Sequence, residues 1–324
     1  MKLTFIVGAF TNLLALASAA SFSNPLKATN GSDPHMTYYN GYYYLMTTTW
    51  TNLQITRAKT LEGLKTGETR VVWTDSDPSR CCNVWAPELH KIGNSWYIYY
   101  TAGNSQNLDG QRMHVLKGGG NPFSRYSYAG QLTQDWGIDG SILAVQNKSY
   151  FVWSCFSGTL QSLCIAPMNS PTTIGARKVL SEPLLDWERA QGQPPVNEGP
   201  TALYHNGKIF LVYSASFCWT PSYQLGVLTY NGGDPTLASS WTKTGPFFSS
   251  ANGNYGPGHN CFINSPDGTE VWNIYHATWI QTGNCDGNRY TAAKKVSWNA
   301  DGSPNFGSPD PLGIVTAGPS GEKA

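Results

Sequence analysis

The chain has 324 residues and a formal net charge of +1, with 13% charged and 13% aromatic residues. It carries no Lys/Arg cluster of the kind that nucleic acid or anionic membranes require, so we expect an uncharged partner, no nucleic acid and no membrane. The 34 glycines and 20 prolines favour short strands joined by turns, with little helix.

Residues 1–19 have the pattern of a secretory signal peptide. Lys2 supplies a positive start, residues 5–16 are mostly apolar, and residues 17–19 form a small-residue cleavage site. A short membrane anchor is the alternative, but the apolar run is too short to span a bilayer and Thr11 and Asn12 interrupt it. We therefore expect a secreted, extracellular protein whose mature chain begins near Ala20.

A pattern of a strand, a tight turn and an aromatic strand occurs five times along the mature chain. The copies contain Ser32-Asp33-Pro34, Trp85-Ala86-Pro87-Glu88, Ile138-Asp139-Gly140, Asn197-Glu198-Gly199-Pro200 and Gly256-Pro257-Gly258-His259. The markers Asp33, Ala86, Asp139, Glu198 and His259 are separated by 53, 53, 59 and 61 residues. Periods near this length are typical of β-propeller blades. The sequence predicts an all-β, single-domain, five-bladed β-propeller over residues 20–317.

The blade boundaries are expected in turn-rich stretches near residues 74, 128, 189 and 249. One helix-like segment covers residues 182–190. The tail, residues 318–324, is rich in small and charged residues, and we expect it to be disordered.

Equivalent positions of successive blades converge on the axis of a propeller. Asp33, Asp139 and Glu198 would then face one another across the central channel. The alternative is that each acid belongs to an ordinary turn between strands. Three acids at one register position of a five-fold repeat favour a shared site.

Seven cysteines in an exported chain should be mostly oxidised, and their odd number leaves at least one unpaired. Cys155 and Cys164 flank a predicted hairpin and are expected to pair. Cys81 and Cys82 are adjacent, while no partner can be read for the other three, which are Cys218, Cys261 and Cys285. Asn30 and Asn147 stand in glycosylation sequons.

Three converging carboxylates have a clear chemical use. Hydrolysis of a glycosidic bond with inversion needs an acid for the leaving oxygen and a base for water on the opposite face of the sugar. A third acid beside the proton donor raises the donor's pKa and keeps it protonated. The abundant Trp and Tyr side chains also suit sugars, whose C–H faces lie against aromatic rings.

The five segments quoted above, taken in order, resemble glycoside hydrolase family 43, a family of inverting five-bladed propeller enzymes that cleave arabinofuranosides and xylosides. Arg289 and the segment from Trp298 to Pro304 match a looser closing pattern. The resemblance implies that Asp33 is the general base, Glu198 the general acid, and Asp139 the group that tunes the pKa of Glu198 and orients it.

Further site residues are expected from the same resemblance and from their positions near the three acids in the sequence. The expected substrate contacts are His35, Trp50, Trp85, Ile138, Trp219, His259 and Arg289. The chemistry requires no cofactor, and the resemblance implies a structural calcium or other ion in the channel, held near His259 through water. Strand alternation is expected to point Glu88 away from the face of Ala86, which leaves Glu88 and also His276 with structural roles.

The substrate is expected to be a plant cell-wall polysaccharide, and the protein a monomer. The segments look most like those of enzymes that release arabinose from the ends of α-1,5-arabinan. A β-xylosidase, a xylan-debranching arabinofuranosidase or an endo-arabinanase is the nearest alternative. A non-catalytic sugar-binding propeller is a further alternative. It is disfavoured because the residues at the five marker positions differ, whereas such a propeller would repeat its binding residues in every blade.

Overall fold

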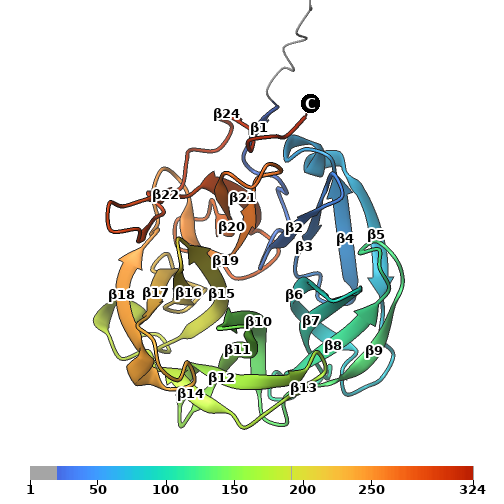
Figure 1. Cartoon of the computed structure of the whole chain (residues 1–324), viewed down its shortest axis with the longest axis vertical. Helices are drawn as coiled ribbons and strands as arrows, with labels where there is room; N and C mark the ends of the chain where they lie inside the picture. Colours follow the sequence, from blue (N-terminus) through green and yellow to red (C-terminus); the bar gives the residue numbers. More distant parts are fainter. Residues whose placement is uncertain (1–19, 191, 324) are drawn as a thin grey trace, which may run out of the picture.

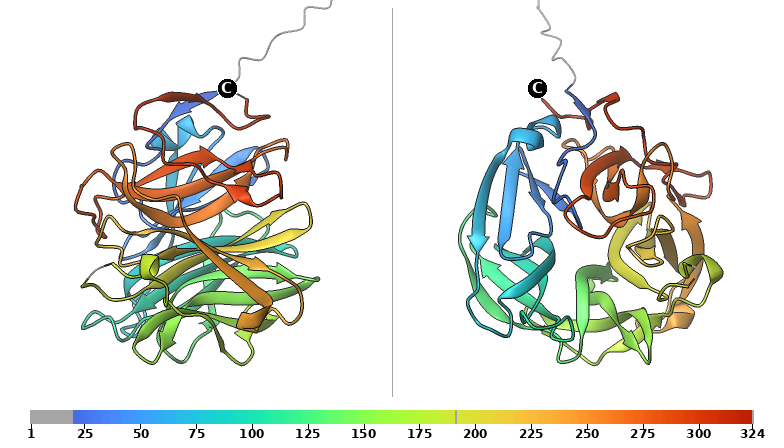
Figure 2. Two further views of the ribbon diagram at one scale, coloured as in Figure 1. Left: turned by 90° about the vertical axis from the view of Figure 1, so that its left-hand side faces the viewer. Right: turned by 180° about the vertical axis from the view of Figure 1, so that it is seen from behind.

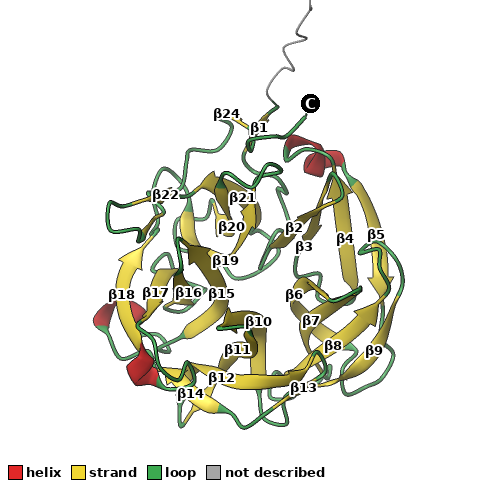
Figure 3. Ribbon diagram, in the orientation of Figure 1, coloured by secondary structure: helices red, strands yellow, loops and turns green. Residues whose placement is uncertain are grey.

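The computed structural model describes residues 20–190 and 192–323, so the expected signal peptide lies outside the described residues. Its strands form five antiparallel sheets around a central axis, as predicted (Figure 1). The view from behind shows the same ring of blades, and the view from the side shows it edge-on (Figure 2). The helical segments of the described chain are three short 3-10 turns at the outer edge (Figure 3).

The blades follow one another along the chain, close to the predicted boundaries. The first blade has β2 (His35–Tyr39), β3 (Tyr42–Met46), β4 (Leu53–Ala58) and β5 (Glu68–Trp73), and the second has β6 (Cys82–Ile92), β7 (Ser95–Gly103), β8 (Arg112–Gly118) and β9 (Tyr126–Gln131). The third blade has β10 (Gly137–Val145), β11 (Lys148–Ser157), β12 (Leu160–Ser170), β13 (Thr173–Ile174) and β14 (Lys178–Ser181). The fourth has β15 (Asn197–His205), β16 (Lys208–Ala215), β17 (Gln224–Tyr230) and β18 (Trp241–Phe247), and the fifth has β19 (Tyr255–Asn264), β20 (Val271–Thr278) and β21 (Tyr290–Lys295).

The smaller elements lie outside these sheets. They are β1 (Ser21–Ser23), β22 (Ser297–Trp298), β23 (Pro304–Asn305), β24 (Val315–Ala317), η1 (Glu62–Thr66), η2 (Asp186–Glu188) and η3 (Ala238–Ser240). The helix expected over residues 182–190 is thus only the single turn η2. Tertiary contacts hold this segment instead, because the buried Glu188 carboxylate accepts from Tyr213 and Lys243 of the fourth blade.

In every blade the first strand lies at the axis and the next strands pair outward (Figure 1). The predicted hairpins between the first and second strands are confirmed. Asn40 and Gly41, for example, connect β2 to β3 with φ values of +48° and +81°. A two-residue turn of this kind requires positive φ at both positions, which Asn-Gly adopts readily. The starting ends of inner strands meet at one mouth of the channel, where His259 Nδ1 lies 3.3 Å from Asp33 Oδ1 and Gly199 N–H donates to Asp139 Oδ2 at 3.1 Å.

The ring is closed by the segment that precedes the first blade. Leu26 N–H donates to Thr291 O at 2.8 Å, and Thr291 N–H donates to Lys27 O at 2.9 Å, so this segment runs along β21 of the last blade. Gly31 lies so close to the backbone of Tyr290 and Thr291 that a Cβ atom there would overlap it. The closure fixes Asp33, two residues further on, beside the fifth blade.

Residues 318–323 differ from the disorder that their composition predicts. Glu322 is 7% exposed, and its carboxylate accepts a hydrogen bond from Leu61 N–H at 3.1 Å. Ser320 N–H donates to Glu270 Oε2 at 3.0 Å. The preceding strand β24 pairs with β1, so long-range pairing holds a segment that has no strong local preference.

Three disulfides join six of the cysteines. Cys155 and Cys164 are bonded across β11 and β12, as predicted, and Cys81 is bonded to Cys82. Cys218 is bonded to Cys285, which ties the loop after β16 to the loop after β20 at the channel mouth. The seventh cysteine, Cys261, is buried and unpaired. These bonds suit an oxidising compartment.

Candidate active site

Each inner strand has one residue with a left-handed backbone near or just before its start, and in the second to fifth blades this residue lies in a bulge. The φ values are +52° at Asp33, +44° at Ala86, +60° at Asp139, +54° at Gly199 and +38° at His259. Bulges re-aim a side chain locally. Here they turn the bulge residues of the blades toward one another at the mouth of the channel.

The strand register places Glu198 one residue earlier than predicted. Ile138 and Glu198 both pair with a serine of the second strand immediately before the bulge, so the equivalent of Asp139 is Gly199. The prediction of three acids at one register position is therefore wrong for Glu198. Glu198 nevertheless acts electrostatically on Asp139, because its longer side chain reaches the same space.

The residues with a left-handed backbone are held by the neighbouring blade. Four of them donate their N–H to a side chain in its second strand or just after it: Asp33 to His276 Nδ1 at 3.0 Å, Ala86 to Thr48 Oγ1 at 2.8 Å, Asp139 to Thr101 Oγ1 at 3.1 Å and His259 to Ser214 Oγ at 2.7 Å. In the fourth blade, Gly199 N–H donates instead to the Asp139 carboxylate, at 3.1 Å from Oδ2. The blade that carries Glu198 is thereby tied directly to Asp139.

Asp33 is surrounded by positive and hydrogen-bonding groups. Its Oδ1 accepts from Arg289 Nη1 at 3.1 Å, and its Oδ2 accepts from Thr48 Oγ1 at 2.5 Å. The Nδ1 atoms of His259 and His276 each lie 3.3 Å from Oδ1. Burial alone would raise the pKa of Asp33, but Arg289 and His259 outweigh it and hold this pKa well below its ordinary value. Asp33 is therefore ionised at neutral pH.

The other two acids show the opposite behaviour. Burial raises the pKa of Asp139 well above its ordinary value, and the charges of Glu198 and Asp33 raise it further. Burial also raises the pKa of Glu198 to about 7, with a further contribution from Asp33. One pit thus holds an ionised carboxylate and a protonatable one, the division of states that acid–base chemistry at neutral pH requires.

Both carboxylate oxygens of Glu198 are positioned by hydrogen bonds. Tyr223 O–H donates to Oε1 at 2.9 Å, and Gln161 Nε2 donates to Oε2 at 2.8 Å. These donors favour the ionised form and oppose the effect of burial on the pKa of Glu198. Tyr223 also stacks on His276, with ring centroids 5.7 Å apart, so it connects Glu198 to the surroundings of Asp33.

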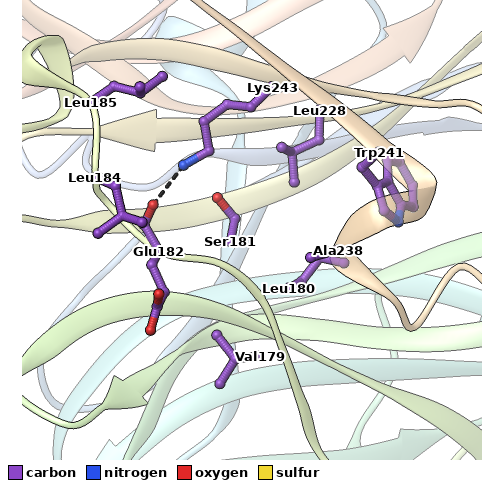
Figure 4. A pocket seen from close by; sticks show the side chains of 10 residues that line it. All are labelled: Val179, Leu180, Ser181, Glu182, Leu184, Leu185, Leu228, Ala238, Trp241 and Lys243. Atoms are coloured by element: carbon purple, nitrogen blue, oxygen red, sulfur yellow. Dashed lines mark hydrogen bonds between the residues drawn. The ribbon is translucent and has the colours of Figure 1, made fainter.

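A buried network fixes the residue before Glu198. Asn197 Nδ2 donates to Glu188 Oε1 at 2.9 Å, and Lys243 Nζ donates to the same oxygen at 2.8 Å. Lys243 also donates to the backbone oxygen of Glu182, in a groove of about 610 Å³ at the outer edge of the third and fourth blades (Figure 4). None of the three acids of the channel lines this groove. The groove is connected to the site only through Lys243, which binds Glu188, which in turn holds Asn197 next to Glu198.

A second polar cluster lies apart from the three acids. Glu88 follows the register shift at Ala86, so simple strand alternation does not give its direction, and it is buried. Its Oε2 lies 2.7 Å from His90 Nε2, in a cavity of about 280 Å³ that His35 also lines. None of the three acids lines that cavity. His35 thus lines a different cavity from the three acids, and its contact with a sugar stays a prediction.

The donor atoms available do not fit a directly bound calcium ion, which takes about six to eight oxygen ligands. His35, Glu88 and His90 bring their ligand atoms within 4.8 Å of one another, but they offer two imidazoles and one carboxylate. Leu89 N–H donates to His35 Nδ1 at 3.1 Å, which leaves the proton of the neutral ring on Nε2. Beside His259, the carboxylate oxygens within reach belong to Asp33 and Asp139, which protein donors already hold.

The remaining expected contacts lie around the mouth. Trp50 and Trp85 pack edge to face with ring centroids 6.0 Å apart, and Ile138 is 8% exposed one residue before Asp139. Trp219 is 50% exposed, in the loop that the Cys218–Cys285 bond ties down. Arg289 and His259 contact Asp33 directly, as described above.

Sequence reasoning missed five polar residues of the pit, and assigned His276 only a structural role. Thr48, Thr101 and Ser214 do have a signal, because each stands at the end of a second strand, one blade before a bulge. Gln161 and Tyr223 have none, because they come from a hairpin and a loop whose positions depend on the neighbouring blades.

An ionised and a protonatable carboxylate in a propeller channel define a glycoside-cleaving enzyme as the class of protein. The sequence profile of "Glycosyl hydrolases family 43" matches residues 22–304. The chain belongs to this family, as the resemblance of its segments implied.

Individual relatives agree with this assignment. The chain is 37% identical over 318 residues to an extracellular exo-alpha-(1->5)-L-arabinofuranosidase of Streptomyces avermitilis, with 92% of this chain and 65% of that protein covered. It is 36% identical to alpha-L-arabinofuranosidase 43 of Humicola insolens, with 95% and 68% covered. The chain therefore spans about two thirds of the length of these relatives.

A solved structure matches nearly the whole chain. The alpha-L-arabinofuranosidase from Lactobacillus brevis superposes with a TM-score of 0.83 at 31% identity, covering 90% of this chain and 98% of that one. A thermostable family-43 glycoside hydrolase has a TM-score of 0.77 at 22% identity and supports the fold alone.

Proposed function

We propose that this protein is a secreted α-L-arabinofuranosidase that inverts the anomeric centre and removes single arabinose units from the ends of α-1,5-arabinan. The observation that carries the proposal is the opposite pKa displacement of Asp33 and Glu198 in one buried pit. The names of the Streptomyces avermitilis and Lactobacillus brevis proteins support the sugar. The first of these names also supports exo action and an extracellular location, and the three disulfides suit export.

In the proposed mechanism, Asp33 accepts a proton from water as the water attacks the anomeric carbon. Thr48 and Arg289 hold the two oxygens of Asp33 in place for this step. Glu198 donates its proton to the glycosidic oxygen as the C–O bond breaks. Burial and the charge of Asp33 keep Glu198 protonated, and Asp139 fixes the fourth blade, which carries Glu198, by accepting a hydrogen bond from Gly199 N–H.

The products of linear α-1,5-arabinan test both the exo mode and the inversion. We expect monomeric arabinose from the first sample onward in a chromatographic time course, and the β-anomer as the first species in a proton NMR spectrum. A ladder of oligomers would indicate an endo-arabinanase instead. Faster release of xylose from xylo-oligosaccharides would favour a β-xylosidase, and release of arabinose from arabinoxylan would favour a debranching enzyme. Binding of several sugars per chain without hydrolysis would indicate a non-catalytic propeller.

The pH dependence of the reaction should respond to Tyr223. Since the Tyr223 hydroxyl stabilises the ionised form of Glu198, replacing Tyr223 by Phe should raise the pKa of Glu198. We expect the alkaline limb of the kcat profile, near pH 7 in the wild type, to move to higher pH. Tyr204→Phe is the control, because the hydroxyl of Tyr204 binds Ala144 N–H outside the pit. A limb that moves to lower pH would contradict this role of Tyr223.

A calcium or other ion held near His259 through water is kept as part of the proposal, with a structural and not a chemical role. Metal analysis of the purified protein and kcat before and after chelation test it. The monomeric state is likewise proposed and is tested by sedimentation. No described helix has the length and apolar character needed to cross a bilayer.

A further inference from the structure

Two aromatic side chains form an exposed platform beside the proposed acid. Phe156 is 41% exposed at the end of β11, and its ring lies against that of Trp136, with centroids 4.5 Å apart and planes inclined by 45°. Trp136 Nε1 donates to the backbone oxygen of Leu108 at 3.0 Å, and Leu108 is itself 52% exposed. The platform is therefore held in place, although much of its apolar surface faces solvent.

The platform is linked to Glu198 by the β11–β12 hairpin. Phe156 pairs directly with Gln161 across this hairpin, and residues paired in this way present their side chains on the same face. Gln161 reaches Oε2 of Glu198 at 2.8 Å. Phe156 is thus the next side chain outward from the residue that holds the acid.

The two oxygens of Glu198 distinguish the two sides of the pit. On the Oε1 side, Tyr223 leads through its stacked partner His276 to Asp33, where water attacks. On the Oε2 side, Gln161 leads to Phe156 and Trp136. In an inverting reaction the leaving sugar departs on the side opposite the attacking water. The leaving part of the substrate therefore passes the Gln161 side.

From this geometry we propose that Trp136 and Phe156 form a binding subsite for the furanose ring on the leaving-group side of the arabinan chain. The proposal rests on the proposed function. The C–H face of a furanose would pack on the exposed rings, an apolar contact that needs no charge. The subsite would favour substrates with at least one sugar beyond the cleaved bond, and so would distinguish arabinan oligosaccharides from arabinosides with a small leaving group.

The test compares two substrates that share the cleaved arabinose. Arabinotriose has sugars on the leaving-group side, and α-L-arabinofuranosyl fluoride has only a fluoride ion to lose. We expect Phe156→Ala and Trp136→Ala each to lower kcat/KM for arabinotriose about five- to tenfold, mostly through KM, and to leave the fluoride reaction within about twofold of the wild type. Phe156→Tyr should restore the wild-type values. Circular dichroism and Tm check that each variant is folded.

Trp279→Ala is the matched control, because Trp279 is 45% exposed and stacks on Tyr290 of the fifth blade. It should leave both reactions unchanged. Unchanged kcat/KM for arabinotriose in both platform variants overturns the subsite, and so does an equal loss on the two substrates. A wild-type protein that cleaves neither substrate overturns the proposed function itself, which separates the two failures.

Discussion

Replacing Glu198 with Gln is expected to lower kcat on arabinan oligosaccharides by about 10²–10⁴-fold, the usual effect of removing a proton-transfer group. The amide keeps the shape of the side chain and can still bond to Tyr223, but it has no proton to give. The remaining activity should lose the alkaline limb that the wild type shows near pH 7. Glu182→Gln, outside the pit, is the control. Turnover close to that of the wild type would remove Glu198 from the mechanism.

The same substitution should not destabilise the fold. Because the folded pKa of Glu198 is raised from an ordinary 4.5 to about 7, the folded chain binds this proton more tightly than the unfolded chain. The contribution of Glu198 to the free energy of unfolding therefore falls as the pH rises from about 4.5 through 7. The Gln variant lacks this loss, so its Tm relative to the wild type should be higher at pH 8 than at pH 5. If the Tm of the variant relative to the wild type were instead lower at pH 8 than at pH 5, the fold would stabilise the ionised form of Glu198.

Replacing Asp33 with Asn is expected to cost at least as much activity, and also stability. The variant has no base for the attacking water, which should lower kcat about 10²–10⁴-fold. It also leaves the guanidinium of Arg289, only 4% exposed, without its negative partner. Removing one member of a buried ion pair typically costs about 3–5 kcal/mol of unfolding free energy. Urea unfolding and initial rates on arabinotriose measure the two effects.

The double variant Asp33→Asn/Arg289→Met separates the two losses. It removes the unpaired charge, so it should recover part of the unfolding free energy and none of the kcat. Asp301→Asn, in an exposed turn, is the control for the substitution itself. If Asp33→Asn retained wild-type turnover, the base would have to be another group. If its stability were unchanged, Arg289 would have a different partner from the one assigned.

Much of the fold followed from local signals. Asn40-Gly41 and its counterparts demand hairpins, and the aromatic strands beside them must be buried, so a ring of blades could be predicted from the repeat. Asp33 and Asp139 could also be placed, because they hold the same position before the hairpin of their blades. The tail could not, since Glu322 is ordered by Leu61, a residue far away in the chain.

The exact strand register at the site could not be predicted by aligning the five repeats. Glu198 stands one residue before its bulge, and only the pairing of β15 with β16 reveals that Gly199 takes the equivalent place. The cavity that His35, Glu88 and His90 share was not predicted either, because it depends on how the blades pack and on a register shift that interrupts the alternation of β6.

The amino-acid sequence by itself determined the five-fold repeat, the all-β architecture and the identity of the acids that meet at the axis, because these depend on local turn chemistry and on period-two burial. Only the tertiary structure decided which acid is ionised. That difference arises from Arg289 and His259 beside Asp33, and from burial with neighbouring negative charge around Glu198 and Asp139. Such electrostatic effects depend on distances between blades, which no stretch of the chain specifies alone.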